Sequence, residues 1–596
     1  MELAISQRDT DILLKERNLL KTEVLEKYRL SGQIAQTTLK YVIELINNSY
    51  HLGKRTQPFS AAEICLLGDS LMSSLLQNAY KNSSIREKGI AQPVTLDVND
   101  IVIGYAPEID DGVNLYFQPG DIVSIGLGCQ IDGYTSNVSH TLVIYPQGVQ
   151  DGETGDLKPT GPLLGSSADA ICAAHIATET VIALLGANLT PEKIPDSISK
   201  NKVVNGTLIR SVVDSIAKSY NCIVVPTSKV RRIRRFLAGQ AEGVVAERDF
   251  KGVVWSEADQ ERQLLERTEK INNDNNSNNN DSKVQELIKY DNSKSNTATN
   301  ASSAIPSDDF VPIAGEVYSV DIKMASIEEL NNEPGLVTLE KIDNYTGKNH
   351  SKDTFTPRPS VFIRDVSISH QLKLKSSRAL INKIDKDLSV YPFKLSYISK
   401  NFPFNVQDEN NLTEQLQETY KEVKINRLGM TELLNRHLTV EKPVLRARFI
   451  PLQIILGSSS NSSTGVKGYD SENPTLPGLE IPLPRLGVTQ LKLKTMLKSS
   501  KPIKVSRETS TVILNNSNSN NSLELIRLTG GSITSKPSWV HSKYQLSGEY
   551  LQGINELIQL TQDERFGIKI KECQPLKISS FEFTKNSNSV ESMNMD

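Results

Sequence analysis

The chain has 596 residues, 38% of them hydrophobic and 23% charged, which is enough apolar material for a large core. Its formal net charge of −3 excludes a polycation, so any nucleic acid would have to bind through local basic patches. Five scattered cysteines without CxxC spacing indicate neither a zinc ribbon nor a disulfide framework, and fit a reducing compartment. No secretory signal or stretch of roughly 18 apolar residues is present, so no membrane span is predicted.

Helices are predicted first along the chain and strands afterwards. Apolar spacing predicts helices within 10–48 and 59–80, and the second begins with the capping-box pattern Ser60-Ala61-Ala62-Glu63. Strand patterns begin near residue 91, with further helices at 166–186 and 205–219 and strands at 310–323 and 444–456. Four Asn- or Ser-rich segments have too few apolar groups to offset the entropy of ordering, so we expect them to be disordered: 272–309, 457–465, 515–522 and 585–596.

These patterns predict one main domain with additions at both ends. We expect a helical extension at 1–90, packed on a domain at 91–456 that carries a disordered insert at about 260–309. A C-terminal part at 457–584 and a disordered tail at 585–596 follow.

Two segments far apart in the chain share one pattern. The segment Gly120-Asp121-Ile122-Val123-Ser124-Ile125-Gly126 is repeated as Gly315-Glu316-Val317-Tyr318-Ser319-Val320-Asp321. The seventh position is Gly in the first segment and Asp in the second. The shared pattern predicts a fold with two related halves.

A hairpin is predicted around Asp132-Gly133, because a type I′ turn needs positive φ at both positions. In the resulting register Val123, Leu127 and Ile131 face Leu142, Val138 and Tyr134 on an apolar side, and His140 is expected there as a core histidine. The opposite side is small and polar, as in a face that lines a cavity. It brings Gly126 and Asn137 together as diagonal neighbours roughly 7–8 Å apart.

The patterns resemble the methionine-aminopeptidase-like, or pita-bread, family of α+β proteins. The resemblance covers roughly 10–456 without the Asn-rich insert, and rests on the repeated segments and the Asp-Gly-Tyr turn at 132–134. Family members bind two metal ions through two Asp, one His and two Glu, with a further His near the substrate. The resemblance places the metal ligands at Gly126, Asn137, Val230, Asp321 and Ile450, and the substrate-side His at Gly104.

Asp321 is the one carboxylate kept among these positions, and a two-metal centre needs several. The resemblance therefore implies a chain without catalytic residues, metal or other cofactor. Asp321 is expected to pair with a basic side chain, hold a single ion or fill space.

Among non-catalytic relatives, the chain is most similar to the fungal factors that export the pre-60S ribosomal subunit. Shared features are the long N-terminal helices, the Asn-rich inserts and the extended C-terminal part. The resemblance implies a ribosome biogenesis protein that shuttles between nucleus and cytoplasm and docks near the polypeptide exit tunnel. Its implied partners are ribosomal proteins, ribosomal RNA, other assembly factors and nucleoporin repeats.

Two alternatives to this function stay open. One is a metalloaminopeptidase whose ligands have moved to Asp97, Asp100 or Asp110. The other is a peptide-binding, chaperone-like module without catalysis.

Two basic clusters are candidates for contact with ribosomal RNA. The denser one holds Lys229, Arg231, Arg232, Arg234 and Arg235, and as a helix it would gather Val230, Ile233 and Leu237 on one face. The other contains Lys492, Lys494 and Lys498 in a run that extends to Arg507. Lys492 and Lys494 alternate with Leu491 and Leu493, which suggests an edge strand. Charges on an edge strand often only prevent aggregation. A solvated face without a partner is the alternative for both clusters.

Overall fold

The computed structural model describes most of the chain outside the Asn-rich segments. The described residues are 15–52, 57–81, 87–111, 115–146, 148–150, 157–235, 252–257, 259–260, 310–330, 334–342, 357–388, 390–404, 409–452, 496–517, 522–563 and 565–577, with a few single residues besides. The expectations of disorder at 272–309, 457–465 and 585–596 lie outside them, as do Lys492 and Lys494.

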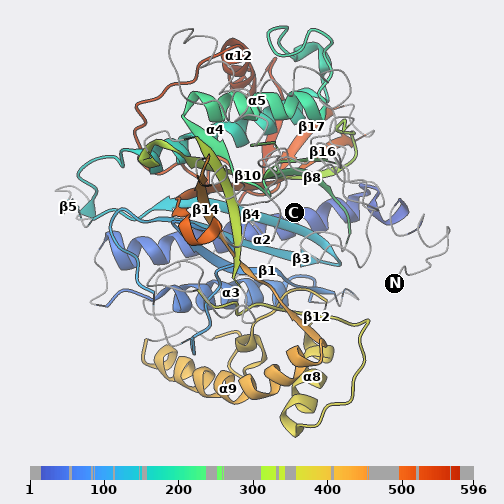
Figure 1. Cartoon of the computed structure of the whole chain (residues 1–596). Coiled ribbons are helices and arrows are strands. Elements are labelled where there is room, and N and C mark those ends of the chain that lie inside the picture. The colour runs from blue at the N-terminus through green and yellow to red at the C-terminus, as the bar shows by residue number, and fades with distance from the viewer. Residues whose placement is uncertain are drawn as a thin grey trace, which may run out of the picture.

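A ten-stranded sheet forms the centre of the fold (Figure 1). Its main path runs β1 (Lys88–Val98), β3 (Ile122–Ile131), β4 (Tyr134–Val143), β16 (Val505–Ser517), β10 (Val317–Ser326), β8 (Lys229–Ile233) and β9 (Gly252–Val254). Off this path, β7 (Cys222–Val224) pairs with β10, β17 (Ser522–Arg527) pairs with β16, and β18 (Ile570–Glu572) pairs with β17.

The path of this sheet is symmetric about its middle. Outward from the β4–β16 junction, the strands are β4, β3 and β1 on one side and β16, β10 and β8 on the other. The two repeated segments lead into β3 and β10, which therefore hold equivalent positions. The α+β pita-bread fold with two related halves is confirmed by this arrangement.

Helices cover each half of the sheet and form its core. In the first half, α2 (Thr22–Ile46) packs on β3 and β4, and α3 (Ala61–Asn78) packs on β1. In the second, α4 (Ser166–Ala187) packs on β10 and β16, with α5 (Gly206–Ser219) and α12 (Leu551–Gln562) beside it. The capping box at the start of α3 is confirmed, since Ser60 Oγ accepts from the Glu63 amide and the Glu63 carboxylate accepts from the Ser60 amide.

Among the described residues, α4 is the helix long and apolar enough to cross a membrane by length and composition alone. However, 78% of its most apolar stretch is buried inside the fold, as expected of a core helix.

A second, four-stranded sheet and a helical insert complete the described fold. The sheet contains β11 (Gly335–Ile342), β14 (Val444–Pro451), β15 (Lys501–Pro502) and β2 (Ile101–Ile103). Between β11 and β14 the chain forms β12 (Phe362–Arg364), α8 (Lys375–Asp387), α9 (Glu409–Asn435) and β13 (Thr439–Glu441), with the two helices at the bottom of Figure 1. Short elements are β5 (Val149–Gln150), β6 (Leu157–Lys158), a π-helix at Asn47–His51 and 3₁₀ turns at Glu16–Asn18, Pro191–Lys193, Glu328–Leu330, Leu395–Ile398 and Leu497–Ser499.

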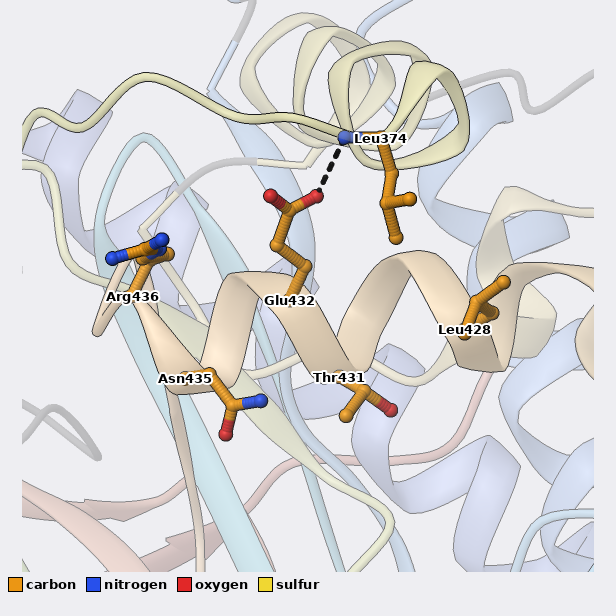
Figure 2. Close-up of a pocket in the computed structure, with 6 residues that line it drawn as sticks. All are labelled: Leu374, Leu428, Thr431, Glu432, Asn435 and Arg436. Atoms are coloured by element: carbon orange, nitrogen blue, oxygen red, sulfur yellow. Dashed lines mark hydrogen bonds between the residues drawn. The ribbon is translucent and has the colours of Figure 1, made fainter.

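A shallow pocket lies where α8 meets α9 (Figure 2). Glu432 on α9 accepts hydrogen bonds from the backbone amides of Lys373 and Leu374, at 2.7 and 3.0 Å. These amides lie at the start of α8, where backbone N–H groups have no partner within the helix. The carboxylate therefore fastens α8 to α9, which is a structural role.

One prediction about the C-terminal part is wrong, and another is wrong at the ends of its segment. A boundary at residue 456 would separate β16 from the main domain, whereas β16 lies between β4 and β10 in the middle of the sheet. Disorder was expected across 515–522, but β16 continues to Ser517 and β17 begins at Ser522, while 518–521 lie outside the described residues. β16 and β17 pair with each other through Asn515 and Asn516. This pairing outweighs the low strand propensity of the Asn-rich sequence.

Candidate functional site

The hairpin of β3 and β4 has the predicted register. Ile131 pairs with Tyr134, and both turn residues have positive φ, 55° at Asp132 and 80° at Gly133. Gly126 pairs with Ser139 and Gly128 with Asn137, so Gly126 and Asn137 are diagonal neighbours as expected.

A single row of residues crosses the sheet through this hairpin. Because directly paired residues share a face, their side chains lie on one side of the sheet. From β1 to β8 the row is Thr95, Gly126, Ser139, Thr509, Asp321 and Lys229. Gly126 and Asp321, the seventh residues of the two repeated segments, therefore occupy equivalent places in the two halves.

Asp321 is surrounded by basic and hydroxyl groups of its own chain. Its Oδ1 accepts from Arg507 Nε and Thr509 Oγ1, both at 2.9 Å. Its Oδ2 accepts from Lys323 Nζ at 2.9 Å and Arg507 Nη2 at 3.2 Å. Burial alone would raise the pKa of Asp321, but Arg507 and Lys323 outweigh it and hold the pKa well below its usual range. Of the expected roles, pairing with basic side chains is the one the structure shows.

Asp321, Lys323, Thr509, Arg507 and Asp97 form a charged cluster that we call the centre. The guanidinium of Arg507 lies in the middle of it, between Asp321 and Asp97. It binds Asp321 from one side, and its Nη1 lies 4.0 Å from Asp97 Oδ2 on the other. A Cβ at Gly126 would lie 3.7 Å from Nη1 and only 2.7 Å from Thr95 Oγ1. The space beside Gly126 is therefore filled by the protein's own side chains.

The three aspartates considered as displaced ligands have different surroundings. Asp97 belongs to the centre, accepts from the Tyr105 amide at 2.8 Å, and has its pKa raised to about 6 by burial. Asp100 pairs with Arg446 and Asp110 with Arg427, at 2.7 and 2.6 Å. Only Asp97 of the three thus joins Asp321 around Arg507.

The structure brings some of the positions implied by the resemblance together and leaves others apart. Gly104 lies at the edge of the centre, where its backbone interacts with the Asp97 carboxylate. Val230 is buried in the core with Val320, on the opposite face from Asp321, and Lys229 is the residue of β8 that faces the centre. Ile450 lies on β14 in the other sheet, and the residue directly across from Asp321 is Thr509 on β16.

The groups present do not suit a pair of metal ions. Among the described residues, no three His, Cys, Asp or Glu side chains are grouped so that they could share an ion. Arg507 and Lys323 already neutralise Asp321, and their charges repel a divalent cation. The arrangement resembles a metal centre in which side-chain cations take the place of the ions.

Sequence reasoning missed Arg507, Lys323 and Thr509. Lys323 carried a local signal, since residues two apart on a strand share a face, which puts it beside Asp321. Arg507 appeared only as the end of a basic run, and 186 positions separate it from Asp321. Its role depends on the pairing of β10 with β16, for which no local pattern exists.

Residues 229–233 of the basic cluster form the strand β8, and not part of the helix considered above. β8 pairs with β10, and Arg232 and Arg234 both form ion pairs with Glu316 on the segment before β10. Arg235 pairs with Asp132 at 2.5 Å and lies over the ring of Tyr134. The side chains of these three arginines are 11–17% exposed, so much of the cluster serves contacts within the protein.

His140 is a buried histidine with partners for both ring nitrogens, which confirms the expectation of a core histidine. Nδ1 lies 2.9 Å from Glu508 Oε1, and Nε2 lies 2.9 Å from the Lys536 carbonyl oxygen. Burial opposes the charged ring, but the Glu508 carboxylate outweighs it and raises the pKa of His140. The contact of His140 with Glu508 therefore ties β4 to β16.

Comparison with known proteins gives full-length relatives in yeasts. No family model matches the chain. It is 55% identical over 599 residues to "Probable metalloprotease ARX1" of Debaryomyces hansenii, and 49% identical over 621 residues to the protein of the same name in Saccharomyces cerevisiae. Both comparisons cover 100% of each chain. A solved structure described as a thermophilic Arx1 has a TM-score of 0.49 at 16% identity, covering 92% of this chain and all of that one.

Sequence identity of 49–55% along the whole length of this chain and of its two relatives is enough to assign the family. The chain belongs to the ARX1 family.

Proposed function

We propose that this protein is a non-enzymatic factor that binds the precursor of the large ribosomal subunit and promotes its nuclear export and maturation. The non-enzymatic part of this proposal rests on the ion pair between Arg507 Nε and Asp321 Oδ1, at 2.9 Å. Asp321 is the position to which the family resemblance assigns a metal ligand. A hydrolytic centre of this type activates water by holding ions with several carboxylates. Here Asp321 is neutralised by Arg507 and Lys323.

The ribosomal part of the proposal rests on the resemblance to pre-60S export factors together with membership of the ARX1 family. It includes docking near the polypeptide exit tunnel, contacts with ribosomal proteins, ribosomal RNA, other assembly factors and nucleoporin repeats, and shuttling between nucleus and cytoplasm. The relatives carry the name of probable metalloproteases, so a metal-dependent aminopeptidase is the competing function.

Lys498 is the basic residue we propose for contact with ribosomal RNA. Of the eight basic residues assigned from the sequence, Arg232, Arg234 and Arg235 have partners inside the protein, and Lys229 faces the centre. Lys498 is exposed in the short turn Leu497–Ser499 before β15, where it can reach a phosphate without breaking a pair with another described residue.

Gradient sedimentation of tagged protein from lysate, across a salt series, tests ribosome binding. We expect comigration with large-subunit precursors that weakens as salt rises, because phosphate contacts release counterions. Lys498→Glu should weaken binding and lower the slope of log affinity against log salt by about one. Lys218→Glu, at an exposed lysine near the end of α5, is the matched control and should behave as wild type. Sedimentation as free protein at every salt concentration would refute the proposal.

Elemental analysis with a peptidase assay tests the competing function. We expect purified protein supplied with Zn²⁺, Mn²⁺ or Co²⁺ to retain far less than one ion per chain, because Arg507 and Lys323 occupy the surviving carboxylate. Near-stoichiometric metal together with turnover of methionyl peptides would establish an enzyme with displaced ligands.

A further inference from the structure

Large aliphatic side chains are exposed in the shallow pocket between α8 and α9. Leu428 on α9 is 64% exposed and Leu374 at the start of α8 is 38% exposed, and both line the pocket. Figure 2 shows the Leu374 side chain pointing toward α9, with Leu428 and Glu432 on either side of it. Ile425, one helical turn before Leu428, is 70% exposed. Three large aliphatic side chains are therefore open to water at one place on the surface.

The core of the helical insert uses another face of α9. There, buried apolar side chains of both helices pack together: Leu380, Ile384, Val423, Met430 and Leu433. Ile425 and Leu428 lie outside this cluster, so α9 carries a second apolar stripe that does not join it to α8. Exposed apolar groups that gather at one place mark an interaction site more often than scattered ones do.

Basic side chains lie next to the aliphatic groups at the start of α8. Lys373 and Lys375 are exposed neighbours of Leu374 in the chain. The exposed side chain of Arg378 turns back to this point, where its Nη1 donates to the carbonyl oxygens of Leu372 and Lys373 at 3.1 and 3.2 Å. Three cations are thus held beside one end of the pocket.

The α9 side of the pocket is basic as well. Lys421 and Lys424 are exposed, and they precede Leu428 by two turns and one turn on the same face of the helix. Arg436 also lines the pocket. Glu432, the acid among the lining residues, already accepts from two backbone amides at 2.7 and 3.0 Å. The surface therefore combines exposed aliphatic groups with a largely basic surrounding.

We propose that this pocket binds an acidic segment of a partner protein, with one large apolar side chain of the segment between Leu374 and Leu428. That side chain would remove the leucines from water, and carboxylates on both sides of it would meet the surrounding lysines and arginines. A volume of about 360 Å³ lies at the low end for ligand pockets and suits a side chain or two. Such binding is additional to ribosome binding and does not depend on it.

An acidic peptide fits this surface better than RNA does. Phosphates would pair with the same cations but would leave the exposed leucines in water. Single-stranded bases bind chiefly by stacking on aromatic side chains, and none of the described residues that line the pocket is aromatic. RNA is therefore the competitor against which the peptide is tested.

Fluorescence anisotropy with the full-length protein and labelled probes tests the pocket. The main probe is the peptide Glu-Glu-Leu-Phe-Glu-Glu with blocked ends. One control peptide replaces Leu-Phe by Ser-Ser, another replaces every Glu by Gln, and a single-stranded oligouridine of equal charge is the RNA control. We expect the main probe to bind at least about tenfold more tightly than each control, because it alone satisfies both the leucines and the cations.

Two matched pairs of variants locate the binding. Leu428→Ser should weaken binding of the main probe about tenfold, as truncation of a central apolar contact does, whereas Leu164→Ser, at a leucine 63% exposed before α4, should not. Lys424→Glu should weaken it, and Lys218→Glu near the end of α5 should leave it unchanged. Because all four side chains are exposed, the variants should fold, which circular dichroism checks.

Four results would overturn the proposal. They are no binding of the main probe, equal binding of the main and serine-containing peptides, tighter binding of the oligouridine, and full affinity in Leu428→Ser. The third result would assign the basic side chains around the pocket to RNA.

Discussion

Replacing Arg507 by Met is expected to cost about 3–5 kcal/mol of unfolding free energy at neutral pH, the usual loss when one partner of a buried ion pair is removed. Arg507 makes two hydrogen bonds to Asp321, and both side chains are less than one-tenth exposed. Without the guanidinium, Asp321 keeps Lys323 as a cationic hydrogen-bond partner, and burial lowers the pKa of that lysine to about 7. Urea denaturation followed by circular dichroism measures the loss.

A double-mutant cycle supplies the control for Arg507. Asp321→Asn in the Arg507→Met background removes the uncompensated charge, so the double variant should be less destabilised than the two single variants added together. A coupling energy of at least about 1 kcal/mol is expected for groups in direct contact. If Arg507→Met unfolds at the wild-type urea concentration, or if the two substitutions are simply additive, Arg507 does not hold the centre together.

Replacing Lys394 by Met is expected to have a comparable effect, one that depends on pH. Lys394 is fully buried, donates to the Pro107 carbonyl at 3.0 Å and lies 3.7 Å from Asp69. Burial opposes its charge, but Glu108 and Asp69 outweigh it and raise the pKa of Lys394. At pH 7.5 the variant leaves two buried carboxylates uncompensated, so we expect a loss of about 3–5 kcal/mol.

The loss in Lys394→Met should shrink as pH falls. Burial already raises the pKa of Asp69 to about 6 and raises the pKa of Glu108. A carboxyl whose pKa is raised on folding favours the folded state at low pH and disfavours it as pH rises through the folded pKa. Removing the lysine raises both pKa values further, so protonation near pH 5 should recover much of the stability. Lys383→Met on the surface of α8 is the control, and an equal loss at pH 5 and pH 7.5 would contradict the explanation.

These charges also explain how the helical insert joins the main domain. The Ser396 amide donates to Glu108 at 3.1 Å, next to Lys394, in the segment that links α8 to α9. Arg427 on α9 pairs with Asp110 and Asp111 on the same loop of the first half. Loss of Lys394 should therefore loosen α8 and α9 first, which hydrogen exchange can detect as reduced protection.

The sequence by itself determined much of the local structure. Turn chemistry at Asp132-Gly133 and alternation of apolar residues set the register of β3 and β4, and these are interactions between neighbours in the chain. The repeated segments predicted two equivalent strands, which β3 and β10 confirm. The sequence also shows that Gly126 and Asn137 carry no carboxylate, because residue identity alone decides that.

Only the tertiary structure decided which groups surround Asp321. The run from Lys229 to Arg235 has a pattern compatible with a helix, but pairing with β10 satisfies its backbone as a strand and turns Lys229 toward the centre. The pairing of β16 between β4 and β10 brings Arg507 and Thr509 to Asp321 from almost 190 positions away. Such pairing joins strands far apart in the chain and depends on packing against helices such as α2 and α4, so no local pattern carries it.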